Sequence, residues 1–480
     1  MSGVGFIADA VGSGRTSAAS VATEVGDRLQ RAAPLNATLD WSQELLDREA
    51  RRLQALPEDV RAGLPLAGVP IALKDNIVTT DQPTTCASKI LEGYISPYDA
   101  TVVTRLRAAG AIIASKTNLD EFAMGSSTEN SAFGRVKNPL DHARVPGGSS
   151  GGSAALVAAG VVPAALGSET GGSVRQPASF CGIVGVKPTY GRVSRYGLVA
   201  FGSSLDQISV FGQTVDDAAR ILAIISGHDS YDSTSADRPP LALEGPRKDL
   251  TGLTIGMPRE YFPPDLDGGV RSALDHTAHL MQQLGATVKE VSLPHAKYAV
   301  PTYYIVAPAE AAANLARFDG VRYGPRHVGR GGDLGSLYRA TRGKGFGPEV
   351  QRRILVGTYV LSSGYYDAYY RKAQQVRALL AEDFRQVFED QAVDLLLTPT
   401  TPTTAFRAGE KTEDPVAMYL ADIFTAAISL AALPAMSLPV GREQGLPIGA
   451  QLVAPMFGEA RMLSVAGTLE ATIDAKREVR

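Results

Sequence analysis

Two Gly-Gly-Ser elements, which end at Ser149 and Ser173, are the part of the sequence best suited to chemistry. They lie 24 residues apart, on either side of a run of small residues typical of a tightly packed helix. Glycines leave the backbone free to turn, so several N–H groups can point to one place. A serine in such a turn can act as a nucleophile whose developing oxyanion those N–H groups hold. The segment therefore predicts a nucleophile site.

Two other kinds of glycine-rich site, the nucleophile elbow with a Ser-His-Asp triad and the phosphate loop, match this segment less well. The pattern G-x-S-x-G occurs around Ser149 and around Ser150, but residues 140–146 before it do not resemble the buried strand of a nucleophile elbow. The six histidines lie mostly in amphipathic helical patterns or polar loops, which disfavours a Ser-His-Asp triad. A phosphate loop needs a lysine directly after its last glycine, and none follows here. A serine activated by a lysine is the remaining alternative.

Lys74 is the candidate base for such a pair. It ends the apolar run Val69–Leu73, so the lysine is suited to burial at the end of a strand. Burial disfavours the ammonium form and lowers the pKa of a lysine, which makes a neutral amine available near pH 7. A surface lysine at a strand end is the other interpretation, and the adjacent Asp75 does not decide between them.

The elements that must position these residues alternate between strands and helices. Apolar runs predict strands at 68–78, 111–115, 253–257, 287–293, 393–399, 435–441 and 448–455, and amphipathic patterns predict helices at 99–110, 153–160, 270–285, 364–389 and 422–433. Such alternation favours an α/β fold with one large sheet. Residues 1–60 are expected to be mainly helical and to pack on the core through Leu45, Leu46, Ala50, Leu53 and Leu56. Residues 61–475 are expected to form a single domain.

The composition of the chain narrows its class. The 480 residues carry a net charge of −3, which gives no general attraction to nucleic acid or to an anionic membrane. Only two cysteines occur, too few for a disulfide framework, and this favours a reducing compartment. No apolar stretch reaches the length of a membrane-spanning helix. We therefore expect a cytoplasmic protein without a membrane partner.

Three stretches resemble the amidase signature family: GVPIALKDN around Lys74, PGGSSGGSAA around Ser149 and GSETGGSVRQPASFCG around Ser173. The resemblance implies a large mixed central β-sheet covered on both faces by α-helices. It also implies a Lys–Ser–Ser triad in which Ser173 is the nucleophile, Ser149 the bridging serine and Lys74 the base. No metal is implied. The backbone N–H groups implied for the oxyanion hole belong to the loop before the nucleophile: Thr170, Gly171 and Gly172.

Residues 120–134, 187–207, 317–324 and 362–374 resemble one branch of this family, the glutaminase subunits of bacterial tRNA-dependent amidotransferases. This implies glutamine as the ammonia donor. Arg353 then matches the residue that binds its carboxylate, Asp422 the residue that binds its ammonium group, and Tyr303 a tyrosine of the same pocket, with Tyr304 as its neighbour. Two departures are Glu169, where the family usually has aspartate, and residues 208–213.

The same branch implies partners. Its members form a heterotrimer with a B subunit, which binds the charged tRNA and activates it with ATP and Mg²⁺, and a small C subunit. This chain would itself carry no cofactor and would send ammonia to the B subunit, for Glu-tRNA(Gln), Asp-tRNA(Asn) or both. Two alternatives are a stand-alone amidase acting on small amides, which the branch-specific stretches disfavour, and a non-catalytic assembly subunit, which the intact triad disfavours.

Overall fold

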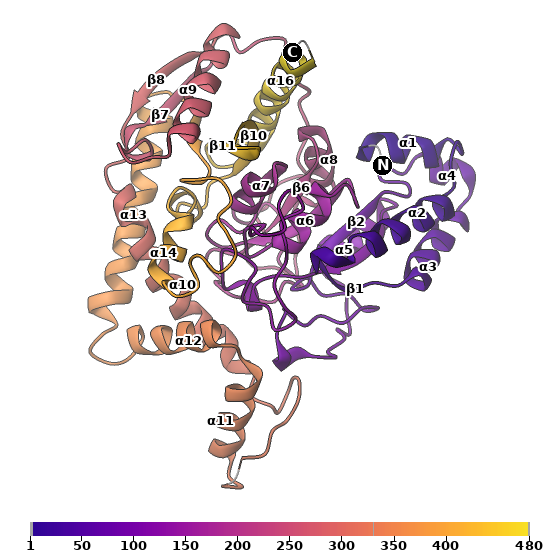
Figure 1. Cartoon of the computed structure of the whole chain (residues 1–480), viewed down its shortest axis with the longest axis vertical. Helices are drawn as coiled ribbons and strands as arrows, with labels where there is room; N and C mark the ends of the chain where they lie inside the picture. The colour runs from indigo at the N-terminus through magenta and orange to yellow at the C-terminus, as the bar shows by residue number, and fades with distance from the viewer. Residues whose placement is uncertain (1–2, 330, 479–480) are drawn as a thin grey trace.

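An eleven-stranded mixed β-sheet runs through the computed structural model, which describes residues 3–329 and 331–478. The strand order is β1-β3-β2-β4-β6-β5-β10-β11-β9-β7-β8. The strands are β1 (Thr38–Asp40), β2 (Pro70–Lys74), β3 (Ile112–Thr117), β4 (Ala164–Glu169), β5 (Val184–Lys187), β6 (Gln207–Gly212), β7 (Thr254–Pro258), β8 (Thr287–Val291), β9 (Leu395–Pro399), β10 (Ala435–Glu443) and β11 (Leu446–Val453). Helices pack against strands from one end of the sheet to the other, and the predicted α/β fold with one large mixed sheet is confirmed (Figure 1).

Strands β2 and β4 set the position of the lysine and serine motifs. They pair in parallel, with Ile71 opposite Ala164 and Leu73 opposite Leu166, and every residue of both strands is buried. Parallel neighbours end at the same edge of a sheet, which is where open α/β sheets place their sites. Lys74 at the end of β2 therefore meets the loop that follows β4 and contains Ser173.

Two short buried helices begin directly after the two Gly-Gly-Ser elements. Helix α6 (Gly151–Ala158) starts two residues before the predicted helix, and α7 (Arg175–Cys181) follows the second element. Small residues allow this close packing, because a methyl group at Gly152 would lie 2.4 Å from the carbonyl oxygen of Asn118. Each candidate serine therefore lies at the N-terminal end of a helix that is fixed against the sheet.

Residues 3–60 are mainly helical, as expected. They form α1 (Val4–Gly12), α2 (Ala18–Arg31), α3 (Gln43–Gln54) and α4 (Glu58–Ala62), which lie together at one side of the molecule (Figure 1). On α3, Leu46, Ala50 and Leu53 are buried and Leu45 is partly buried, as is Leu56 just after the helix. One hydrophobic cluster includes residues from Val4 to Ile473, and β1 pairs with β3 at the edge of the sheet. The separation of residues 1–60 from residues 61–475 stays a prediction.

The remaining helices complete the fold (Figure 1). Helix α9 (Gly268–Gln283) packs on β8 to β11, and α16 (Glu459–Glu478) packs on β10 and β11. Helix α10 (Ala299–Asn314) packs against α12 (Pro348–Val360), α13 (Lys372–Arg385) and α15 (Ala426–Leu430). The others are α5 (Thr101–Ala108), α8 (Val215–Ile225), α11 (Leu334–Gly345) and α14 (Pro415–Tyr419).

The helix predicted for residues 422–433 is shorter in the structure. A 3₁₀ turn covers Leu420–Asp422, and α15 begins only at Ala426. Between them, distant side chains bind the carbonyl groups: Arg175 Nη2 donates to Thr425 O at 3.0 Å, and Gln451 Nε2 donates to Phe424 O at 3.0 Å. These carbonyls are thus satisfied outside a helix, which lets the chain turn here.

Candidate active site

Lys74 and Ser149 form the centre of the site. The Nζ atom of Lys74 lies 2.7 Å from Ser149 Oγ and donates to Ser168 O at 3.2 Å. Both side chains are fully buried. Burial lowers the pKa of Lys74 to about 7, although the carboxylates of Asp120 and Asp206 act in the opposite direction. Near neutral pH this amine is therefore partly neutral and able to accept a proton.

The turn before Ser149 is held from several sides. The Gly148–Ser149 peptide is cis. The N–H of Gly148 donates to Gln176 Oε1 at 3.0 Å, and Ser149 O accepts from the N–H of Asp120 at 3.2 Å. A side chain at Gly148 would place its Cβ 2.1 Å from Asp120 Oδ2 and 2.6 Å from the backbone nitrogen of Ser127. Only glycine fits at this position.

The loop that contains Ser173 lies against the Ser149 turn, because the N–H of Ser150 donates to Ser173 O at 3.2 Å. Ser173 itself is 7% exposed, whereas Ser149 is fully covered. Within residues 3–329 and 331–478, the backbone N–H groups of Gly171, Gly172 and Ser173 have no hydrogen-bond acceptor. An oxyanion hole requires free backbone donors of this kind.

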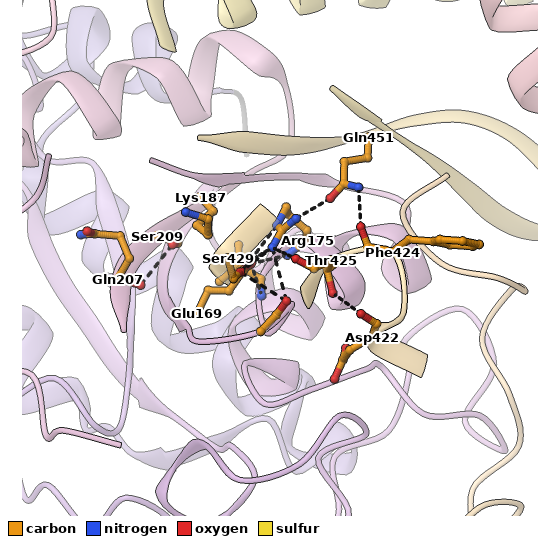
Figure 2. Close-up of polar contacts among 12 residues, drawn as sticks. Glu169, Arg175, Lys187, Gln207, Ser209, Asp422, Phe424, Thr425, Ser429 and Gln451 are labelled. Carbon is orange, nitrogen blue, oxygen red and sulfur yellow. Dashed lines mark hydrogen bonds and ion pairs between the residues drawn. The ribbon is translucent and has the colours of Figure 1, made fainter. Parts of the chain in front are cut away.

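A buried ion pair between Glu169 and Arg175 fixes this loop (Figure 2). The sequence alone did not indicate this pair as part of the site. Glu169 Oε2 accepts from the N–H groups of Val174 and Arg175 at 3.0 Å each, and Arg175 Nε donates to Glu169 Oε1 at 2.7 Å. Burial alone would raise the pKa of Glu169, but the Arg175 guanidinium keeps this pKa below its usual value. The carboxylate of Glu169 thus serves the role of a helix cap for α7.

Arg175 also joins the Ser173 loop to the opposite wall (Figure 2). Its guanidinium donates to Thr425 O, to Ser429 Oγ at 2.9 Å and to Gln451 Oε1, and it reaches Gly171 O at 3.4 Å. The sequence offered one signal for this role, a charged residue two positions after the candidate nucleophile and at the start of an otherwise uncharged helix.

Asp422 lies beside the Gly-Gly-Ser loop. A methyl group at Gly172 would lie 2.9 Å from Asp422 Oδ1 and 2.2 Å from Thr425 Oγ1. Asp422 Oδ2 accepts from Ser126 Oγ at 2.5 Å, whereas Oδ1 is buried and has no hydrogen-bond partner among the described residues. Burial raises the pKa of this carboxyl to about 7. An acceptor of this kind suits a cationic ligand group next to the loop.

Tyr303 and Arg353 complete the predicted set. A methyl group at Gly171 would meet the Tyr303 ring at 2.9 Å. Arg353 is 4% exposed and lies 5.4 Å from the Tyr304 ring centre, and its Nε donates to Glu349 at 2.8 Å. Its two Nη atoms make no hydrogen bond within the described part of the chain, so they are free to bind a carboxylate. The rings of Tyr303 and Tyr304 are 5.0 Å apart, and both tyrosines belong to this wall.

The arrangement brings together an amine that is partly neutral near pH 7, two serines, free backbone donors, a carboxyl group and a guanidinium. The first three suit nucleophilic attack on an amide carbonyl, and the last two suit a zwitterionic amino acid. Among residues 3–329 and 331–474, we find no group of His, Cys, Asp and Glu side chains that could hold a metal ion. Likewise, none of the described helices has the length and hydropathy to cross a membrane.

Comparison with known proteins gives matches along nearly the whole chain. A family model described as Amidase matches residues 23–463. The A subunit of glutamyl-tRNA(Gln) amidotransferase from Carboxydothermus hydrogenoformans is 57% identical over 459 residues, which cover 95% of this chain and 93% of that protein. The protein of the same name from Symbiobacterium thermophilum is 54% identical over 94% of this chain and 93% of its own length. The crystal structure of the Thermotoga maritima protein of that name has a TM-score of 0.78 and 44% identity, covering 94% of this chain and 90% of that one.

Proposed function

The chain belongs to the amidase family, and from this we propose that it is the glutamine-hydrolysing A subunit of a tRNA-dependent amidotransferase. The near full-length similarity to proteins of that name supports the assignment. Within the site, the main support is the unpartnered Asp422 Oδ1 beside Gly172. A bound ammonium group would favour the charged form of this buried carboxyl next to the nucleophile loop. A site for simple apolar amides has no need of that charge.

In the proposed mechanism, Ser173 is the nucleophile. Neutral Lys74 takes a proton from Ser149, which takes one from Ser173 as Ser173 Oγ attacks the side-chain amide carbon of glutamine. The N–H groups of Gly171, Gly172 and Ser173, with that of Thr170, hold the oxyanion. Ser149 then returns a proton to the leaving ammonia, and water hydrolyses the resulting γ-glutamyl ester to glutamate. Each free backbone donor contributes about 3 kcal/mol to stabilising the transition state.

Glutamine recognition is assigned to Tyr303, Arg353 and Asp422. The Nη atoms of Arg353 bind the α-carboxylate, and Asp422 Oδ1 accepts from the α-ammonium group. Tyr303 packs against Gly171 and limits the space beside the scissile amide. An amide without an ammonium group would bind weakly, because it would leave the buried Asp422 oxygen unpaired.

The partners follow from the assignment. Ammonia is passed to a B subunit, which uses ATP and Mg²⁺ to activate the side chain of Glu-tRNA(Gln) or Asp-tRNA(Asn), and a C subunit completes a heterotrimer. This chain is proposed to need no cofactor of its own. The cytoplasmic location expected from its composition belongs to the same proposal.

A substrate comparison tests the proposed function. Ammonia release is measured for the chain alone and for its complex with the B and C subunits, with glutamine, glutamine methyl ester and an aryl amide. We expect a strong preference for glutamine, increased by the partner subunits. Efficient hydrolysis of varied amides by the lone chain, without preference for glutamine, would assign it instead to the stand-alone amidases.

A further inference from the structure

Residues 316–346, which we call the basic finger, differ in charge from the rest of the chain. They contain seven Arg and Lys residues and two Asp residues, a formal charge of +5 in a chain whose net charge is −3. They also contain eight glycines. The segment ends in α11, which projects from the body of the molecule (Figure 1).

The described cations of the basic finger make no close ion pairs. Within its described part, residues 316–329 and 331–346, no Arg or Lys makes an ion pair, whereas arginines pair with Asp or Glu in many other parts of the chain. The side chains of Arg322, Arg339 and Lys344 are exposed. Asp319 and Asp333 lie close enough to act electrostatically on Arg322, Arg342 and Arg339. Two carboxylates leave most of the seven cations uncompensated, and this net positive charge attracts an anionic partner.

The base of the finger is fixed to the body near the candidate site. Ser88 Oγ donates to Gly345 O at 3.2 Å, and the N–H of Gly347 donates to Glu121 Oε2 at 2.8 Å. Gly345 packs on Ile90, since a methyl group there would lie 3.0 Å from its Cβ. These contacts give α11 a defined direction relative to the domain, so its cations are presented on a positioned element.

We propose that the basic finger binds the phosphate backbone of the tRNA that the amidotransferase complex holds, an inference that rests on the proposed function. RNA backbone is contacted by Arg and Lys side chains and by exposed backbone N–H groups, which glycine-rich segments offer. Among the exposed side chains of the finger, charged ones outnumber the large apolar ones, which are Val321, Val328 and Leu334. This favours a phosphate backbone over an acidic protein surface, because the centre of a protein interface is mainly apolar. The finger would add a phosphate contact to those made by the B subunit.

The experiment uses the complete complex with its B and C subunits. Binding of an uncharged tRNA(Gln) transcript is followed by fluorescence anisotropy at several salt concentrations. The test variant combines Arg322→Glu, Arg339→Glu and Lys344→Glu; a second combines the three changes to Gln, which remove charge without adding any. The control combines Arg31→Glu, Arg51→Glu and Lys248→Glu, three exposed cations outside the finger that also lack an ion pair among the described residues.

We expect Kd to rise at least about tenfold for the Glu variant and less for the Gln variant. The slope of log binding constant against log salt concentration should decrease in magnitude by roughly 2 to 3. The control should change Kd less than about twofold, and glutamine hydrolysis without tRNA should be kept by all three. An unchanged Kd and slope in an intact complex would overturn the proposal. So would failure of the finger variants to assemble with the B subunit, which would make the finger a protein interface. A wild-type complex that binds no tRNA would instead contradict the proposed function.

Discussion

The amine of Lys74 lies 2.7 Å from the hydroxyl of Ser149, and both side chains are fully buried and so shielded from bulk solvent. Lys74 comes from the end of β2 and Ser149 from the turn before α6, so the contact depends on the sheet and the glycine turn together. In the proposed mechanism, Ser149 can pass a proton to Lys74 only when the lysine is neutral, so the protonation state of the lysine controls activity.

The first prediction concerns pH. Burial lowers the pKa of Lys74 to about 7, so the amine is protonated and inactive as a base below that pH and neutral above it. At saturating glutamine, kcat for ammonia release should therefore rise with pH, with a midpoint near 7. Lys74→Met should lower kcat by at least about 10³-fold at every pH. A kcat that falls as pH increases through 7 would rule out Lys74 as the base.

The second prediction concerns Gly148. In Gly148→Ala, the new Cβ would lie 2.1 Å from Asp120 Oδ2 and 2.6 Å from the Ser127 nitrogen, so the Ser149 turn must shift. We expect a loss of about 1–3 kcal/mol in unfolding free energy and at least about a hundredfold loss of activity. The control Gly268→Ala, where a methyl group meets nothing within 4 Å, should change neither by much. Denaturant unfolding measures the unfolding free energy, and ammonia release measures the activity. If Gly148→Ala matches Gly268→Ala in both quantities, the Ser149 turn does not require glycine.

The third prediction concerns recognition of glutamine. Asp422→Asn removes the charge that we assign to the ammonium group but can keep the contact with Ser126, which is 2.5 Å away. The KM for glutamine should rise by roughly 10–100-fold. For an amide that lacks an α-ammonium group, such as glutaramic acid, the substitution should raise KM much less. If both substrates lose activity equally, Asp422 supports the loop and does not bind the ammonium group.

The fourth prediction concerns the ion pair between Arg175 and Glu169. Both side chains are fully buried, so Arg175→Met leaves an unpaired buried carboxylate and should lower the unfolding free energy by about 3–5 kcal/mol. The control Arg385→Ala removes an arginine that pairs with three exposed carboxylates, and it should cost less than about 1 kcal/mol. Thermal unfolding compares them. A similar small loss for both variants would show that the pair does not hold the loop.

Local patterns were enough to predict the elements that position Lys74 and Ser149, but not β4 and α7, which flank Ser173. The apolar run before Lys74 predicts β2, and glycines followed by small residues predict a tight turn and α6, because both depend on neighbours in the sequence. The turn at Asp422 could not be predicted in this way. It is fixed by Arg175 and Gln451, side chains distant in the sequence, and the helical pattern of residues 422–433 contains no sign of them.

The residues proposed to bind glutamine could not be predicted from local sequence patterns either. Arg353 looks like an ordinary helix charge in the sequence, and only the family resemblance drew attention to it, together with Tyr303 and Asp422. Tyr303 lies on α10, Arg353 on α12 and Asp422 in the 3₁₀ turn before α15. Their relative positions depend on how α10 packs against α12 and α15, which no local pattern encodes. The role of Arg175 was missed because its partners come from three separate segments of the chain.

The identity of the nucleophile is tested most directly by trapping the acyl-enzyme. The complex is mixed with glutamine, quenched in acid within one turnover, digested and analysed by peptide mass spectrometry. We predict one γ-glutamyl group on the peptide that contains Ser173, attached at Ser173, and its absence from Ser173→Ala. A γ-glutamyl group on Ser149 or another residue, or unchanged ammonia release by Ser173→Ala, would contradict the assignment of Ser173 as the nucleophile.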